Sequence, residues 1–488
     1  MLHNLDWLAP REVFPPPAEK ERLHRYRSNL KVFNNDQWGL EQEYLPYLRR
    51  ISTVITNFGD YFQFPVLFNY QRLMSVKMAD LICGELPIIT GDTEAQNKEI
   101  TKIRDNSAFD TRLYSTVIDM SRYGDAIWRV YKSSHNYNTF VCWDPSHWFP
   151  IVSQDGTLTI LQHVLCWIVE KGTKEYPKQE LHVQVHDKGS YEFRRYKMDH
   201  NVGTIGDLLE KKVIRTGLSD FAVFSLRSFA TSDTVYGSDD YMIVDSILAE
   251  LMVRVAQIST ILDRHADPAL TGPVSMLKQD EKTGRMYLET GKFYAVSQGE
   301  EQPKYLTWDG RLESAFKQIE LLINQLYIIS EMGAALLGEA SSGTQAVSGT
   351  AFRFKMVNPL AKARRITNGL SLNVRQLFAL MSEIGYKKIS RDDISIEWSD
   401  GLPDDPRENV ELVKLITGAK HIMPLELAIV EHFRRTNEEA KKWLDMLSKQ
   451  ELAGEDPNKP GPQDGTGVNP QKHGSDTGLK SFQAPTNK

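Results

Sequence analysis

The sequence predicts an α+β protein, and three patterns along the chain lead to this fold class. Short β-type segments follow one another from Ala126 to Leu226, as in an antiparallel sheet. Three long helical patterns follow between Asp239 and Gly385. A compact β-rich insert separates the first two of these helices. Runs of strands followed by runs of helices are typical of the α+β class.

Two of the long helices are predicted to form a hairpin. The first, residues 239–264, would be roughly 40 Å long. It is expected to stop at Asp267-Pro268, because proline disfavours helix in the residue before it. The second covers residues 311–337. Apolar residues recur at helical spacing in both, namely Val244, Ile247, Leu251, Val255, Ile258 and Leu262, then Leu312, Phe316, Ile319, Ile323 and Leu326.

The segment between these helices is predicted to be a small β-rich domain at the tip of the hairpin. Its β-type runs are 285–289, 292–296 and 304–308, and Gly284, Gly291 and Gly299 supply the turns.

A small, polar segment follows the second helix at residues 338–349, which predicts a mobile loop. The third helix is expected over residues 350–385. Its apolar stripe comprises Ile366, Leu370, Val374, Leu377, Met381 and Ile384. Pro359 should kink this helix rather than end it, because the stripe resumes directly afterwards.

The N-terminal part of the chain begins with an arm, residues 1–34, predicted to pack poorly unless a neighbour covers it. Asn69 is a candidate N-cap for a helix that ends near Gly84. Another helix is expected at residues 107–122, before the strands.

The C-terminal part contains a strand at residues 394–398 that is expected to return to the first domain, which would then be discontinuous. Residues 407–449 should hold at least two helices. Residues 451–488 carry five prolines and almost no apolar residues, so we expect a disordered tail.

Composition limits the classes of protein to consider. The 488 residues, 41% of them hydrophobic, can form two to four domains. The absence of a long apolar run or a basic, apolar leader predicts a cytoplasmic protein. Cys83, Cys142 and Cys166 are too widely spaced for a disulfide framework or a zinc site and are expected to be buried free thiols. The net charge of −6 argues against a broad cationic surface that grips nucleic acid, although DNA could still be a passing cargo.

Several phrases in the chain resemble those of a known family. They are Lys77-Met-Ala-Asp-Leu-Ile-Cys-Gly-Glu-Leu-Pro, Ser121-Arg-Tyr-Gly-Asp-Ala, Leu262-Asp-Arg-His-Ala-Asp-Pro, Ser348-Gly-Thr-Ala-Phe and Ile394-Ser-Ile-Glu-Trp-Ser-Asp-Gly-Leu-Pro. Together with the order helix, insert, helix, loop and kinked helix, they resemble the portal proteins of tailed bacteriophages, in particular the SPP1-like, Gp6-like family. The resemblance covers about residues 35–449.

The resemblance implies a portal fold with an α+β wing, a helical-hairpin stem, a small α/β clip, a long kinked helix and a helical crown. The implied ranges are 1–34 for an N-terminal arm, 35–237 for the wing, 239–264 and 311–337 for the stem, 266–309 for the clip, 404–450 for the crown and 451–488 for a disordered tail. Residues 338–403 would return to the wing and supply a tunnel loop (338–349), the kinked helix (350–385) and a strand (394–398).

In function, the resemblance implies a ring, usually of twelve copies, at one capsid vertex of a virion, assembled in the host cytoplasm. Such a ring nucleates head assembly and conducts dsDNA during packaging and ejection. Its implied partners are the terminase large subunit, the major capsid and scaffolding proteins, and the head completion or adaptor protein. Neither a cofactor nor a membrane nor an enzymatic activity is implied.

Three sets of residues are assigned through this resemblance. The DNA-channel loop comprises Gly338, Ser341, Ser342, Gly343, Thr344, Gln345, Val347, Ser348 and Gly349. Stem assembly is assigned to Val244, Ile247, Leu251, Val255, Ile258, Ile319, Ile323 and Leu326. The terminase-facing residues of the clip are Lys278, Glu281, Lys282 and Arg285.

The sequence also contains patterns that other chemistries would use. Gly338 and Gly343 have the spacing of P-loop glycines, but Thr344-Gln345 stands where Lys and Ser/Thr are required, so nucleotide binding is not expected. An acidic cluster could hold Mg²⁺, although a solvated strand end and turn is favoured; it comprises Asp392, Asp393, Glu397, Asp400, Asp404 and Asp405. His182 and His186 share a strand face and are interpreted as ordinary sheet residues.

Two questions stay open. Basic residues open the kinked helix and would serve either intersubunit ion pairs or a site near DNA; they are Arg353, Lys355, Lys362, Arg364 and Arg365. The competing functions are a metal-dependent nucleic-acid-processing enzyme that uses the acidic cluster, and a non-portal helical scaffold protein.

The loop at 338–349 is predicted to touch DNA weakly, because it contains no Lys or Arg and so lacks a strong counterion-release contribution. Changing Ser342 and Thr344 together to Lys should leave rings intact but slow DNA translocation or lower the yield of filled heads. Packaging assays on ring-confirmed variants check this. Normal rate and density would remove the loop from the DNA path.

Overall fold

The computed structural model describes residues 1–36, 68–172, 177–199, 202–266, 270–271, 277–279, 284–288, 299, 304–305, 312–338, 349–399, 401, 406–417, 422–433 and 437–454. Contacts divide the chain into a first unit, Met1–Leu402, and a second unit, Pro403–Lys488. Strands and long helices occupy separate stretches of the first unit, which confirms the predicted α+β class. Among the described residues, no helix has both the length and the apolar character needed to span a lipid bilayer.

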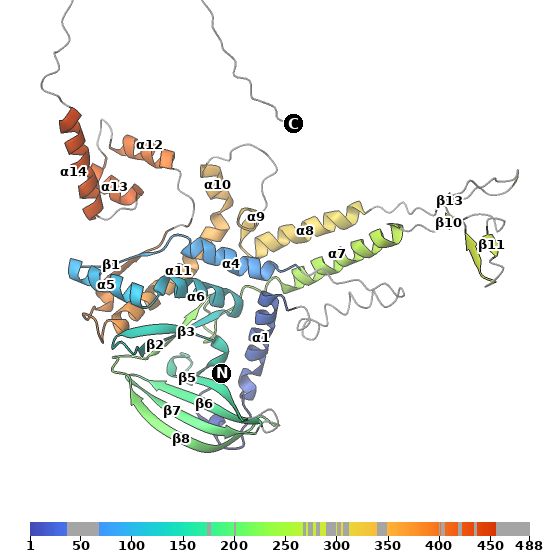
Figure 1. Cartoon of the computed structure of the whole chain (residues 1–488), viewed down its shortest axis with the longest axis horizontal. Helices are drawn as coiled ribbons and strands as arrows, with labels where there is room; N and C mark the ends of the chain where they lie inside the picture. Colours follow the sequence, from blue (N-terminus) through green and yellow to red (C-terminus); the bar gives the residue numbers. More distant parts are fainter. Residues whose placement is uncertain are drawn as a thin grey trace, which may run out of the picture. The chain divides into compact units, whose positions relative to one another are not determined.

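The larger sheet of the first unit has five antiparallel strands in the order β4-β5-β6-β7-β8 (Figure 1). The strands are β4 (Trp148–Val152), β5 (Ile160–Gly172), β6 (Pro177–Asp187), β7 (Ser190–Met198) and β8 (Ile205–Arg215). Val164 pairs with Val185, and Cys166 pairs with Val183. Because alternate residues share a face of a strand, this register places the apolar side chains in one buried cluster.

The N-terminal segment packs on this cluster, so the prediction of a poorly packed arm is wrong. It forms η1 (Asp6–Leu8), η2 (Pro17–Glu19) and α1 (Lys20–Asn34). Leu2, Trp7 and Leu8 are buried there. The Val152 amide donates to the Leu2 carbonyl (2.9 Å), and the Arg11 amide donates to the Ile205 carbonyl (2.7 Å). The segment therefore bonds to both edge strands, β4 and β8. The apolar residues before α1 follow no helical or strand period that would have revealed this packing.

A second sheet, ordered β3-β2-β9, lies under a layer of helices. Its strands are β2 (Asp125–Lys132), β3 (Asn138–Trp143) and β9 (Val223–Arg227), and the helices include α4 (Tyr70–Cys83), α5 (Glu94–Asn106) and α6 (Phe109–Tyr123). Trp128 of the central strand is fully buried and donates to the Thr116 hydroxyl of α6 (2.8 Å). The Asn69 side chain accepts from the Arg72 amide (3.0 Å), which confirms the predicted N-cap of α4.

The strand expected at residues 394–398 is present as β14 (Ile394–Glu397), one residue shorter than predicted. It pairs antiparallel with β1 (Ile88–Gly91), which precedes it by about three hundred residues in the chain. This pairing places the segment after the third long helix within the first unit.

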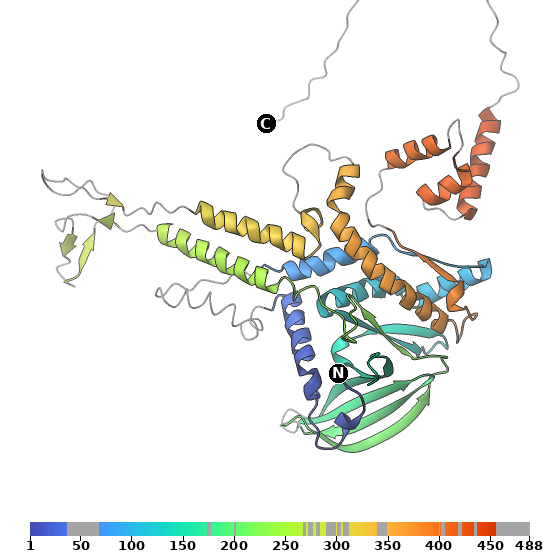
Figure 2. The ribbon, with the colours of Figure 1, turned by 180° about the vertical axis from the view of Figure 1, so that it is seen from behind.

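The two hairpin helices, α7 (Asp245–Ala266) and α8 (Glu313–Ile329), run side by side (Figure 1 and Figure 2). Both are shorter than predicted. The Asp239 carboxylate accepts from the Tyr241 amide (3.0 Å) and the Met242 amide (2.9 Å), which holds a turn where the helix was expected to start. Beyond α8, the backbone is left-handed at Glu331 (φ 58°) and Gly333 (φ 65°), so the helix cannot continue to residue 337.

The third long helix is divided into α10 (Gly349–Lys355) and α11 (Val357–Met381), and α9 (Gly333–Leu336) precedes them. The interruption lies at Met356, whereas a kink was expected at Pro359. Proline lacks an amide proton, and its ring clashes with the carbonyl four residues earlier, which here belongs to Lys355. Pro359 therefore disrupts the helix about four residues before its own position, where α10 ends. The predicted extension to residue 385 is also wrong, because α11 ends at Met381.

The insert at the end of the hairpin contains two short antiparallel pairs. β10 (Leu270–Thr271) pairs with β13 (Lys304–Tyr305), and β11 (Leu277–Gln279) pairs with β12 (Met286–Leu288). The predicted β-type runs at 285–289 and 304–308 contain β12 and β13, and the run at 292–296 lies outside the described residues.

The second unit contains α12 (Pro406–Ile416), α13 (Leu425–Phe433) and α14 (Asn437–Gly454), which agrees with the expectation of at least two helices. Val413, Ala428, Ile429 and Ala440 are its buried apolar residues among those described. The disordered tail was predicted to start at residue 451, which is wrong for its first four residues, because α14 continues to Gly454. Residues 455–488 of the predicted tail lie outside the described residues.

The fold makes a prediction at Gly124, which has φ +83° and closely approaches Gly237. A Cβ added to Gly124 would lie 2.6 Å from the Gly237 carbonyl oxygen. Gly156 has the same φ with nothing within 4 Å, so it is a matched control. Gly156→Ala should lower the free energy of unfolding by about 1–2 kcal/mol, because alanine disfavours the left-handed backbone. Gly124→Ala should cost about 1–3 kcal/mol more because of the clash. Urea unfolding measures both, and equal losses would contradict this packing.

Candidate functional site

The segment between α9 and α10 was predicted to line a DNA channel. Its ends are described: Gly338 has φ +92°, and Gly349 begins α10. The other predicted channel residues lie outside the described residues; they are Ser341, Ser342, Gly343, Thr344, Gln345, Val347 and Ser348. The structure therefore defines how this loop is held at both ends.

The apolar residues of the hairpin divide into a buried set and an exposed set. Val244 and Leu251 are already covered by the core of their own chain, and Leu251 is only 2% exposed. Leu326 of α8 is also fully buried. These three residues, predicted to serve stem assembly, have no surface left to offer to a second copy. Ile258 is buried as well, whereas Ile247, Val255, Ile319 and Ile323 are partly buried.

Other apolar residues of α8 are exposed. Leu321 is 57% and Ile328 is 62% exposed, and Phe316 is also exposed. Sequence analysis placed Phe316 on the stripe that faces the partner helix and overlooked the other two. A helix that is apolar on more than one side has a second face that can be buried by another chain.

Two of the five basic residues near the third helix are paired within the chain. Lys362 Nζ lies 2.7 Å from an Asp240 carboxylate oxygen, with side chains only 7% and 8% exposed. Arg365 forms an ion pair with Glu331. Neither of the two interpretations predicted an intrachain role. Lys355 and Arg364 are exposed on the same helices.

Asp240 joins several elements around the base of the hairpin. The Ser121 hydroxyl donates to its second carboxylate oxygen (2.6 Å), and the Asp240 amide donates to the Ser121 carbonyl (2.8 Å). Ser75 of α4 lies within hydrogen-bond distance of both the Ser121 hydroxyl (2.9 Å) and the Tyr241 hydroxyl (2.8 Å). This buried polar network links α4, α6 and α11 to the turn before α7.

A second buried carboxylate holds α1 in place. The Tyr26 hydroxyl donates to Asp125 (2.5 Å), and the Gly237 amide donates to its other oxygen (2.9 Å). Burial raises the pKa of Asp125 to about 6, while the two hydrogen bonds oppose this change. Arg25 of α1 pairs with Asp239 (2.9 Å) and Asp245 (2.6 Å). These contacts attach the N-terminal helix to the start of α7.

The hypothesis of a metal-dependent enzyme requires metal ligands that lie close together. Among the described residues, no group of three His, Cys, Asp or Glu converges as a metal site. In the acidic cluster, Asp393 accepts from Gln96 (2.8 Å) and Asp392 pairs with Arg391 (3.5 Å). The cluster members Asp400, Asp404 and Asp405 lie outside the described residues.

The histidines and cysteines are explained by packing. His182 contacts Glu180 (3.3 Å), and His186 contacts Gln184 (3.1 Å), as ordinary sheet residues would. All three cysteines are free; Cys83 and Cys166 are buried, as predicted, and Cys142 is half-buried. Burial raises the pKa of Cys83 to about 12, which disfavours the reactive thiolate.

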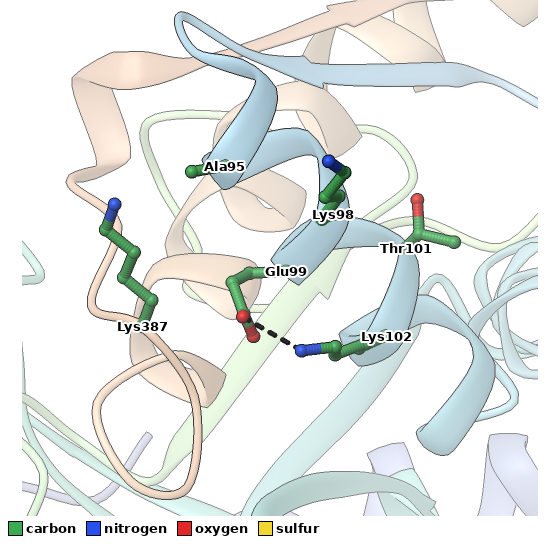
Figure 3. Close-up of a pocket in the computed structure, with 6 residues that line it drawn as sticks. All are labelled: Ala95, Lys98, Glu99, Thr101, Lys102 and Lys387. Atoms are coloured by element: carbon green, nitrogen blue, oxygen red, sulfur yellow. Dashed lines mark hydrogen bonds and ion pairs between the residues drawn. The ribbon is translucent and has the colours of Figure 1, made fainter.

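A shallow hollow of about 430 Å³ lies on the surface of α5 (Figure 3). Lys387 faces α5 across it, and Lys102 is paired with Glu99 (3.0 Å). The other lining residues are Ala95, Lys98 and Thr101. Lys98 is also paired, with Glu94. Lysines neutralised by carboxylates of their own helix do not form an anion site.

The predicted terminase-facing residues lie in the insert. Arg285 is exposed just before β12. Lys278 belongs to β11, and Glu281 and Lys282 lie outside the described residues.

Part of the chain matches a known protein family. Residues 17–206 match the family model described as phage portal protein, SPP1 Gp6-like. Over this range, the chain is similar to the SPP1 Gp6-like portal proteins. The resemblance inferred from the sequence is thereby confirmed, and the matched range contains the phrases beginning at Lys77 and Ser121. A search of curated proteins found no match.

Similar solved structures come from gene transfer agent (GTA) particles. One is the neck of a native GTA particle computed with C12 symmetry, with 11% sequence identity, coverage of 74% of this chain and 89% of the other, and a TM-score of 0.44. The second is the virion of a native GTA particle, with 12% identity, 75% and 89% coverage, and a TM-score of 0.41. The third is the neck of an empty GTA particle computed with C6 symmetry, with 13% identity, 74% and 89% coverage, and a TM-score of 0.43.

The contact between Lys362 and Asp240 was missed at the sequence level, although a signal existed. Lys362 lies four residues before Ile366 and so occupies the same stripe as the apolar residues of α11. A lysine on a buried stripe requires a buried carboxylate, and the acidic pair Asp239-Asp240 precedes the helix at the base of the hairpin.

Proposed function

We propose that this chain forms the ring-shaped portal at one vertex of a phage-like capsid and conducts dsDNA through the ring during packaging and ejection. The match of residues 17–206 to the SPP1 Gp6-like portal family carries this proposal. Portal proteins are structural proteins, and the role proposed here is structural rather than enzymatic.

The parts of the chain take the following roles in this proposal. Residues 35–237 with 338–403 form the wing, 239–264 and 311–337 the stem, 266–309 the clip and 404–450 the crown. The ring nucleates head assembly, and the clip docks the terminase motor. Capsid, scaffolding and head completion proteins are its other partners.

The exposed apolar face of α8 supports ring formation. Leu321 and Ile328 are seven residues apart, so they lie on the same side of the helix. Their exposure costs free energy that a neighbouring copy would recover, at about 25 cal/mol for each Å² of apolar surface buried. Repeating one heterologous contact around a closed ring covers this face in every copy.

Charge supports sliding rather than tight binding of DNA. The chain carries a net charge of −6, and residues 338–349 contain no Lys or Arg. Each phosphate contact made by a cation strengthens binding and would add friction to a moving duplex. Hydroxyl and amide groups of this loop supply weaker contacts that can be exchanged as DNA passes.

Assembly is tested by charging the exposed face. Leu321→Asp together with Ile328→Asp should abolish rings, because two carboxylates would be buried in the interface. Val213→Asp on β8 is the matched control, since Val213 is 68% exposed and lies outside the hairpin. Mass photometry should find rings for the wild type and the control but subunits for the double variant, while circular dichroism spectra show that all three proteins are folded. Rings formed by the double variant would remove α8 from the interface.

Terminase docking is tested in the clip. Charge reversals at Lys278, Glu281, Lys282 and Arg285 should leave rings intact but weaken terminase binding or terminase-driven packaging. Charged residues at the rim of an interface mainly affect association rate and specificity, so a several-fold effect is expected. Normal packaging by all four variants would reject the clip as the docking surface while leaving the ring itself unchallenged.

A further inference from the structure

One helix, α11, contacts the chain just before α7 and just after α8, where the hairpin begins and ends. Lys362 of α11 forms its ion pair with Asp240, in the turn before α7, and also donates to the carbonyl of Ser330, directly after α8 (3.1 Å). A lysine near the last carbonyls of a helix satisfies them and interacts favourably with the negative end of the helix dipole. Lys362 therefore connects the start of one hairpin helix with the end of the other.

A second cation lies one turn further along α11. Arg365 pairs with Glu331, the residue after Ser330. Glu331 has a left-handed backbone (φ 58°), a conformation that is unfavourable for a residue other than glycine. The ion pair and the backbone turn therefore occur at the same residue, where the chain leaves α8.

The contact of Lys362 is buried and fully satisfied. Asp240 receives the Ser121 hydroxyl on one oxygen and the lysine ammonium on the other. If the hairpin moved and separated Lys362 from Asp240, an unpaired charge would remain in the core, which is strongly destabilising. The contact thus resists gradual sliding of the hairpin against α11.

The same region includes both sides of the 339–348 loop. Gly333, at the start of α9, lies so close to the α10–α11 junction that an added Cβ would be 3.5 Å from the Lys355 carbonyl and 3.7 Å from the Pro359 ring. α9 leads to Gly338 and α10 begins at Gly349. The helix that leads into the loop, α9, therefore packs against the α10–α11 junction, and α9 itself begins two residues after Glu331, which Arg365 holds.

We propose that Lys362 and Arg365 are positioning residues that lock the base of the hairpin to α11, so that the hairpin and the two helices flanking the loop move as one body. Their role is within the subunit and is not direct contact with DNA. This proposal rests on the proposed portal function for its significance: the position of the hairpin would set the position of the loop.

Spin-label distance measurements test the lock. Labels would be attached to cysteines replacing Lys317 of α8, which is exposed, and Lys132 of β2, which is also exposed, in a protein whose three native cysteines are replaced by alanine. Labelled protein is diluted with unlabelled protein before assembly, so that distances within one chain dominate. A locked hairpin gives one narrow distance distribution. Lys362→Met and Asp240→Asn should each broaden it at least two-fold, and Lys362→Arg should restore most of the narrow distribution.

The control is Arg104→Met, which removes a less buried ion pair with Asp110 (2.8 Å) between α5 and α6, away from the hairpin. It should leave the distribution narrow although it also removes an ion pair. If Lys362→Met fails to fold, Arg365→Met provides the test at an exposed pair and should broaden the distribution to a smaller extent. A narrow distribution in folded Lys362→Met, or in folded Arg365→Met where the former does not fold, would overturn the proposal. The readout needs neither DNA nor terminase, so failure of the portal proposal would not alter it.

Discussion

The described core of the first unit depends on satisfying one buried carboxylate. Asp240 lies in the turn before α7, where it contacts α6 and α11, and a charge in such a place is tolerated only when it is paired and hydrogen-bonded. Lys362 and Ser121 provide this compensation. Gly124 and Gly237 approach each other closely, and this brings the chain that carries Asp240 close to the end of α6, where Ser121 lies. A mainly apolar junction would permit several packings of the hairpin, whereas this polar contact favours one.

The periodic parts of the fold were predictable, because burial of one face produces a repeating pattern. The helix that Asn69 caps and the strand β14 were predicted from such patterns. The ends of the helices were not predictable, since they depend on particular backbone contacts. The turn at Asp239 makes α7 start later than expected, and the ring of Pro359 would clash with the carbonyl of Lys355 in a continuous helix. The packing of residues 1–19 was missed because Leu2, Trp7 and Leu8 meet the sheet through an irregular backbone. Of the candidate site, the loop was located by composition, but the Lys362–Asp240 contact required knowledge of which elements meet.

The hairpin shows how one sequence can satisfy two requirements. Leu251 and Leu326 stabilise the subunit, whereas Leu321 and Ile328 are left exposed by it. Sequence periodicity assigned Leu251 and Leu326 to stem assembly and left out Leu321 and Ile328, because an apolar stripe does not reveal which chain covers it. The distinction changes the choice of variants, since charging Leu251 would unfold the subunit and report nothing about assembly. The exposed set, rather than the whole stripe, defines the surface available to neighbours.

The central claim is that copies of this chain close into a ring with a central channel. Electron microscopy of the purified full-length protein, with two-dimensional class averages of end-on views, tests it most directly. We expect closed rings of about twelve copies around a hole wide enough for a DNA duplex. Exclusively monomeric particles, or open filaments without a central hole, would contradict it.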